Sequence, residues 1–252
     1  MLPVHEKRFW EIDFARGTAV LMMIVFHALF DLEFFAGRQT GVSQGFWWWF
    51  ARATAALFVF IAGVCLHLSY SRSKKLGAQF VAQKFLRRGT KIFTLGLLIT
   101  AATFVFLENN GTIWFGVLHF IAVGTIISLL FVSRPKLCLP AGVAAIMLGT
   151  FLQNLESGFP WLYWLGVKPA GFYSYDYFPM FPWLGVMLLG IWFGSLAYPA
   201  AERKFKFLDL SEPKNLASKV LRFAGRNSLA IYFLHQPALI ALVFLARAGG
   251  LA

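Results

Sequence analysis

The chain has 252 residues, of which 59% are hydrophobic and 18% aromatic, whereas only 13% carry a charge. This composition excludes a water-soluble domain, because a soluble core of this length needs a polar surface around it. The formal net charge of +12 would suggest nucleic acid as the partner of a soluble protein. Here the basic residues lie in clusters between apolar runs as long as a bilayer is thick, so we expect a membrane protein and no nucleic-acid partner.

Seven apolar runs predict an all-α fold, a polytopic transmembrane helical bundle of about seven spans, with an uncertainty of one. The expected spans are residues 14–35, 46–70, 90–107, 113–132, 137–152, 179–197 and 228–246. We find no internal repeat and no linker, so residues 1–252 are interpreted as a single transmembrane domain.

The segments between these runs differ in character. Residues 71–88 can form an amphipathic cytoplasmic segment that leads into the third span. A tight turn is expected at 108–111, and residues 153–178 form the longest non-helical stretch. Loops of that length usually carry function. The last span is interrupted by Pro237.

Charge asymmetry predicts the orientation of the chain. The basic residues are concentrated in 72–91, 134–136 and 203–226, which fall on one side if the spans alternate. By the positive-inside rule this side is the cytoplasm, and the N-terminus is cytoplasmic. The expected location is a prokaryotic inner membrane. The first apolar run contains His27 and lacks a small-residue cleavage site, so it is interpreted as a retained helix and not as a signal peptide.

The two cysteines, Cys65 and Cys138, lie in or beside apolar runs. A disulfide and a metal site are therefore not expected.

The first span carries the most informative polar residues. Arg16 and His27 are eleven residues apart, about three helical turns, and so lie within about 20° of each other on one helix face. Their separation along the axis is on the order of 16 Å, which puts Arg16 at the cytoplasmic rim and His27 well inside. Asp31 follows His27 by four residues, so its carboxylate can reach the imidazole.

Such a pair can work as a general base, because the carboxylate fixes the tautomer of the imidazole and stabilises its charged form. The alternative is a histidine that bonds a neighbouring helix and only specifies packing.

These residues also resemble a known group of enzymes. Arg16 followed after ten residues by His27 is similar to the Arg-x10-His signature of the membrane acyltransferase 3 family, in which the histidine is taken as catalytic. The stretch 12–20 is more similar to the catalytic domain of the heparan-alpha-glucosaminide N-acetyltransferase family, and 58–63, 115–120 and 226–232 resemble later segments of it in order.

The resemblance implies a donor of the acyl-CoA type, most simply acetyl-CoA, that enters from the cytoplasm, and an acceptor near the outer side that is often a sugar amine or hydroxyl. The lysosomal member of this family has asparagine at the position of His27, and its catalytic histidine lies in the loop that follows. Catalysis by His27 therefore follows the acyltransferase 3 pattern, and the lysosomal substrate is not carried over.

The donor phosphates need basic partners, because no nucleotide-binding motif is present. We expect Arg16, next to Asp13, together with Arg87 and Arg88, to bind them. The alternative for this basic cluster is orientation of the chain and contact with anionic lipid.

Further polar residues are candidates for the cavity and the acceptor site. They are His119, Asp176, Asn227, Ser228, Tyr232 and His235. Ser228, Tyr232 and His235 share one helix face, which is either a lining of the site or a polar seam between helices. Asp176 lies among aromatic residues that suit an interfacial belt or a sugar platform.

The expected function is transfer of an acyl group, most simply acetyl, from cytoplasmic acyl-CoA to a small acceptor near the outer face, with His27 and Asp31 as catalytic residues. The alternative is a small-solute or proton-coupled transporter in which His27, His119 and His235 form a polar path. Membrane lipid is an expected partner, and a homodimer is left open.

Overall fold

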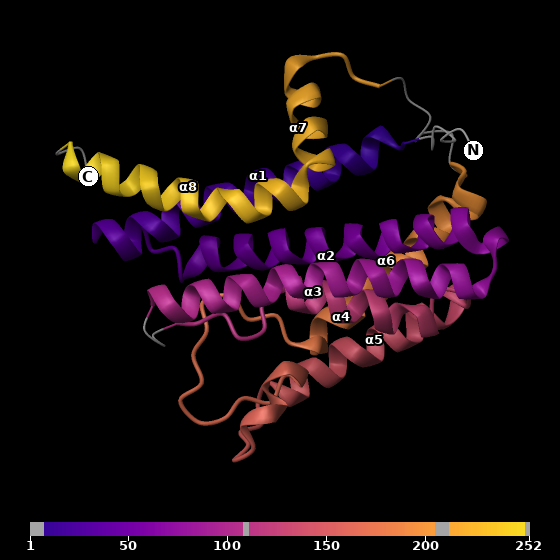
Figure 1. Cartoon of the computed structure of the whole chain (residues 1–252), viewed down its shortest axis with the longest axis horizontal. Coiled ribbons are helices and arrows are strands. Elements are labelled where there is room, and N and C mark those ends of the chain that lie inside the picture. The colour runs from indigo at the N-terminus through magenta and orange to yellow at the C-terminus, as the bar shows by residue number, and fades with distance from the viewer. Residues whose placement is uncertain (1–7, 108–110, 205–211, 250–252) are drawn as a thin grey trace. The chain divides into compact units, whose positions relative to one another are not determined.

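The computed structural model describes residues 8–107, 111–204 and 212–249 (Figure 1). Within these residues the regular structure is helical, and the only bridge between extended segments joins Glu156 to Lys168. The α-helices are α1 (Trp10–Ala36), α2 (Gly45–Ser73), α3 (Ala78–Phe106), α4 (Val117–Ile127), α5 (Pro135–Leu152), α6 (Met180–Ala197), α7 (Leu216–Arg226) and α8 (Ser228–Ala248). The prediction of an all-α bundle is confirmed.

Six of the described helices are long and apolar enough to cross a membrane: α1, α2 with its 3-10 extension to Leu76, α3, α5, α6 and α8. They match six of the seven expected spans. The chain is thus a multi-pass membrane protein. Apolar side chains point outward from these helices, among them Phe106, Met147 and Leu245, as expected when lipid is the solvent.

The fourth expected span is shorter than predicted. Its apolar helix covers only Val117–Leu130, whereas a bilayer core needs roughly 20 helical residues. Helix α4 begins late because Gly116 is extended, with φ −86° and ψ −175°. The apolar run 113–132 therefore includes residues that approach the helix as irregular chain.

Two boundaries also differ from the prediction. Helix α3 begins at Ala78, so most of the expected amphipathic segment 71–88 belongs to that helix. The break before it lies at Gly77, whose φ of +97° suits glycine. Helix α8 runs unbroken through Pro237, so the predicted interruption is wrong.

Parts of some predictions lie outside the described residues. These are residues 108–110 of the expected turn and residues 205–211 of the basic cluster 203–226.

The chain divides into two compact units, described here one by one. The first contains Met1–Ile61 and Phe207–Ala252, and the second contains Ala62–Lys206. In the first unit α1 packs against both α7 and α8.

Helices in both units approach closely at glycines. In the first unit a Cβ on Gly17 of α1 would lie 1.8 Å from the carbonyl oxygen of Leu221 in α7. In the second unit α5 packs on α6, where a Cβ on Gly185 would lie 2.5 Å from the carbonyl oxygen of Gly142. Close backbone contact at small residues is the usual way in which helices associate in membranes, because lipid supplies no hydrophobic drive between them.

Candidate active site

His27 of α1 and His235 of α8 lie against each other in the first unit. Their ring centroids are 4.8 Å apart, and the ring planes cross at 78°. The ring of Tyr232 lies 5.6 Å from that of His235, one turn earlier on α8. The structure thus brings together three residues that the sequence suggested for one site.

The hydrogen bonds of the two rings determine their neutral tautomers. Nδ1 of His27 lies 2.9 Å from the carbonyl oxygen of Met23, and Nδ1 of His235 lies 2.7 Å from that of Tyr232. A carbonyl oxygen only accepts, so each Nδ1 carries the hydrogen. The Nε2 atom of each neutral ring then has a free lone pair and can accept a proton.

Asp31 has a different partner from the one expected. Its Oδ1 accepts a hydrogen bond of 2.6 Å from Nε2 of Gln236 on α8, and its side chain is fully buried. The expected contact between Asp31 and His27 is therefore not the one that the structure makes. The reason is that Nδ1 of His27 is already bonded to its own helix.

The residues around this histidine pair present several acceptors. Among the described residues, no hydrogen-bond partner reaches the buried atoms Oδ2 of Asp31, Nε2 of His235 and Oε1 of Gln236. Unpaired buried polar atoms are costly in a protein and need an explanation. These three are all acceptors, so the group that would satisfy them is a hydrogen-bond donor.

Gln236 was not among the residues suggested by the sequence. A single amide in an apolar helix has no characteristic spacing. The only available signal was its position beside His235.

Asn227 and Ser228 lie at the start of α8. The side-chain amide of Asn227 donates to the carbonyl oxygen of Phe223 at 2.9 Å, which ties the end of α7 to the beginning of α8. Asn227 is exposed and Ser228 half-buried. Both therefore mark the junction of α7 and α8, two turns before His235.

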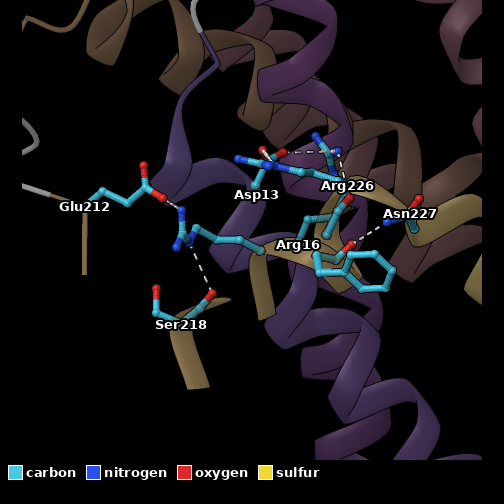
Figure 2. A network of polar contacts seen from close by, with 9 residues as sticks. Asp13, Arg16, Glu212, Ser218, Arg226 and Asn227 are labelled. Atoms are coloured by element: carbon cyan, nitrogen blue, oxygen red, sulfur yellow. Dashed lines mark hydrogen bonds and ion pairs between the residues drawn. The ribbon is translucent and has the colours of Figure 1, made fainter. Parts of the chain in front are cut away.

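Arg16 and Asp13 belong to a polar network between α1 and α7 (Figure 2). Asp13 is buried, and its carboxylate lies 3.2 Å from Nε of Arg226 and 3.8 Å from Nη1 of Arg16. Arg16 also donates to the carbonyl oxygen of Gly225 at 3.2 Å. These contacts hold the last turn of α7 against the first turns of α1.

The other two residues expected at the donor site, Arg87 and Arg88, lie on α3 in the second unit. Both are exposed. The four expected donor-site residues are thus divided between the two units.

His119 and Asp176 meet at the start of α4 in the second unit. Oδ2 of Asp176 accepts from the backbone N–H of Val117 at 3.0 Å, and Nδ1 of His119 accepts from that of Gly116 at 3.3 Å. The ring of His119 is buried between Phe93 and Phe115. In this arrangement both residues satisfy backbone N–H groups that the helix itself leaves free.

The stretch 153–178 before α6, here called the aromatic loop, is also partly buried. The hydroxyl of Tyr177 donates to the carbonyl oxygen of Tyr163, and Lys168 lies 5.0 Å from the Tyr177 ring centroid. Burial raises the pKa of Tyr177, so this phenol keeps its proton and its hydrogen bond. Trp161 and Tyr173 remain exposed.

Cys65 and Cys138 are free thiols. Within the described parts of the chain, no three or more histidine, cysteine, aspartate or glutamate side chains are grouped so that they could hold a metal ion.

The fold and the histidine pair define a multi-pass membrane protein with a polar site between two of its helices. The chain belongs to the family of the catalytic domain of heparan-alpha-glucosaminide N-acetyltransferase, whose model matches residues 8–237. It is therefore a member of a membrane transferase family, and the resemblance noted in the sequence is confirmed. No match was found among curated proteins or among solved structures.

Proposed function

We propose that this protein transfers an acyl group, most simply acetyl, from acyl-CoA to a hydroxyl or amine of a small, sugar-like acceptor. The observation that carries the proposal is the pair of His27 and His235, whose Nδ1 atoms are both bonded to backbone carbonyls. This arrangement leaves an Nε2 lone pair free on each neutral ring, as a general base requires.

In the proposed reaction Nε2 of His27 takes the proton from the acceptor hydroxyl or amine. The oxygen or nitrogen attacks the thioester carbonyl carbon, and the carbon–sulfur bond breaks. The proton on His27 then passes to the departing CoA thiolate, so the ring returns to its neutral form. In the alternative route, Nε2 of His27 attacks the thioester carbonyl carbon, CoA leaves as its thiolate, and the acceptor then takes the acyl group from the transient acyl-histidine, its proton passing to CoA.

The unpaired acceptor atoms beside the histidines support the same role. Oδ2 of Asp31 and Oε1 of Gln236 can accept hydrogen bonds from the donating groups of the acceptor substrate. The buried carboxylate of Asp31, one turn beyond His27, also favours a positive charge on the imidazole during proton transfer. Asp31 thereby assists catalysis without a direct bond to His27.

The donor enters from the basic side, which we assign to the cytoplasm of a cell with an inner membrane. Arg16, held in place by Asp13, supplies positive charge for its phosphates. The acceptor meets the donor toward the outer side.

A transporter with a path of three histidines has less support. Nδ1 of His119 already accepts from the backbone N–H of Gly116, so it serves the start of α4. Binding of CoA would separate the two functions, because a transporter has no reason to bind it.

The test uses the purified full-length protein and measures thermal stability with acetyl-CoA, longer acyl-CoAs and free CoA. A ligand present at a concentration 100 times its Kd stabilises the folded state by about 2.7 kcal/mol, and this raises the melting temperature. His27→Ala should retain this stabilisation and lose acyl transfer by about a hundred- to ten-thousand-fold.

The control is His67→Ala, which removes a buried histidine bonded to Ser71 on its own helix. It should lower stability without a comparable loss of transfer. An active but destabilised His27→Asn protein would show that His27 serves packing, because asparagine can still hydrogen-bond between helices.

A further inference from the structure

We propose that α7 is an interfacial helix that lies in the plane of the cytoplasmic leaflet and binds anionic phospholipid. Its apolar stripe, Leu216, Val220 and Phe223, lies among the acyl chains, and Lys214 and Lys219 contact the headgroups. This role rests on the proposed orientation of the chain and is separate from the proposed catalysis.

The exposed face of α7 is apolar, although the segment as a whole is basic. At about 100° per residue, Leu216, Val220 and Phe223 fall within about 60° of one another on the helix. Their side chains are 76%, 56% and 67% exposed, respectively. A stripe of three large, exposed apolar side chains on an eleven-residue helix is costly in water.

The opposite face of α7 is fixed to α1. Ser218, Arg222 and Gly225 are buried, and a Cβ on Gly225 would lie 1.8 Å from the carbonyl oxygen of Asp13. The ion pair between Asp13 and Arg226 closes the same contact. The attachment to α1 thus determines which face of α7 points away from the protein.

The attachment also determines the depth of α7. Asp13 and Gly17 are in the first two turns of α1, a helix that is long enough to span the membrane. Figure 1 shows α7 standing steeply against α1, with its last turn leading into the start of α8. A helix that crosses the end of a spanning helix in this way lies along the membrane surface, as amphipathic interfacial helices do.

The charges of this segment favour an anionic surface. Arg222 pairs with Glu212 and Arg226 with Asp13. Lys214 and Lys219 are exposed and have no ion pair among the described residues. Lys219 lies about 40° from Phe223 around the helix axis, at the edge of the apolar stripe. Its ammonium group can therefore reach the headgroups while the methylene groups of its side chain stay beside the stripe.

The test measures the depth of α7 in a bilayer by spin labelling of the full-length protein. Single cysteines replace Val220 or Phe223 in a background in which Cys65 and Cys138 are changed to alanine. Leu245→Cys, on the exposed side of α8, provides the lipid reference, and Glu202→Cys provides the water reference. The bilayer is a nanodisc of phosphatidylcholine, with or without phosphatidylglycerol.

The measured quantity is the ratio of a label's accessibility to oxygen to its accessibility to a water-soluble nickel complex. This ratio should be similar for the labels at Val220, Phe223 and Leu245, and several-fold lower for the label at Glu202. Phosphatidylglycerol should move the labels at Val220 and Phe223 deeper into the bilayer. Lys214→Gln combined with Lys219→Gln should abolish this change in depth. Labels as accessible to nickel as the one at Glu202 would overturn the interfacial assignment. Spin–spin broadening of the spectra would show that a second copy of the chain covers the stripe, and would also overturn the assignment. A label depth that does not change with phosphatidylglycerol would overturn the role of the lysines. None of these readouts requires acyl transfer, so they stand or fall independently of the proposed function.

Discussion

Asp31 combines a contact between two helices with a proposed role in catalysis. It is fully buried and accepts a hydrogen bond from Gln236, which lies 205 residues later in the chain. A buried carboxylate that loses its donor retains the full cost of its removal from water. The contact between Asp31 and Gln236 therefore fixes α8 against α1 at the level of the two histidines.

Gln236→Leu should destabilise the protein by about 1 to 3 kcal/mol, because it leaves the Asp31 carboxylate without its donor. Unfolding in detergent, followed by circular dichroism, measures the change. Gln153→Leu is the control, since Gln153 is exposed at the end of α5. Adding Asp31→Leu to Gln236→Leu should restore part of the loss, and two independent, additive losses would show that the pair is not coupled.

Arg16 has two possible roles, donor binding and attachment of α7, and matched substitutions separate them. Arg16→Ala should weaken CoA binding about ten- to a hundred-fold, the usual cost of losing a charge-assisted contact. Arg226→Ala breaks the same network at Asp13 but leaves Arg16 in place. Equal weakening of CoA binding in both variants would show that Arg16 acts through the position of α7 and not on the donor.

The sequence suggested His27 and His235 as neighbours in one site, but it did not predict their hydrogen bonds. His27 was suggested by its spacing from Arg16, and His235 by the polar stripe that it shares with Tyr232. The pairing of Asp31 with His27 was allowed by helix geometry, but a carbonyl on α1 and an amide on α8 are stronger competitors at these positions. Such competition depends on how α8 packs on α1, which no local spacing encodes.

At the scale of elements, apolar runs predicted which segments cross the membrane but not where helices begin. Six runs became helices of sufficient length. Helix α4 is shorter than its run because its first turn is capped by Asp176, which lies 59 residues beyond Val117. A long-range cap of this kind cannot be recognised from hydropathy.

The residues of α7 were interpreted from the sequence only as part of the basic cluster 203–226, although the pattern of a helix was present in them. Leu216, Val220 and Phe223 follow the i, i+4, i+7 spacing of an amphipathic helix. The surrounding lysines and arginines lowered the average hydropathy and concealed this stripe.

The close contact between α1 and α7 predicts a strong response to a single methyl group. Gly17→Ala should destabilise the protein by about 1 to 3 kcal/mol, because its Cβ would overlap the carbonyl oxygen of Leu221. Gly249→Ala is the matched control in the same unit, where the nearest atom to the new Cβ is 3.5 Å away. Thermal unfolding compares the two, and equal melting temperatures would contradict the close packing of α7 on α1.

At the scale of the whole molecule, every proposed role depends on which side of the membrane a segment faces. Basic residues alternate with neutral or acidic segments along the chain, which orients a multi-pass protein during insertion. In the proposed orientation the run 113–132 crosses the membrane in addition to the six longer helices. Arg16 and α7 then share the cytoplasmic side, and the aromatic loop faces outward.

Reporter fusions test this orientation directly. A reporter after Lys75 or Lys136 should be cytoplasmic, and one after Gly171 should be external. The measurement is the activity of a reporter enzyme that works in only one compartment. A cytoplasmic reading at Gly171 would reverse the orientation, and with it the side from which the donor enters.

The first compact unit combines the beginning of the described chain with its end, and this arrangement has a consequence for biogenesis. At about 5 to 20 residues per second, the ribosome reaches Gln236 roughly 10 to 40 s after Asp31. Asp13 waits as long for Arg226, which lies 213 residues later. During this interval Asp31 lacks the donor that later satisfies it, and Asp13 has Arg16 but not Arg226. We therefore expect Asp31 to stay sheltered from lipid until α8 is made, although α1 is the first of the described helices to be synthesised.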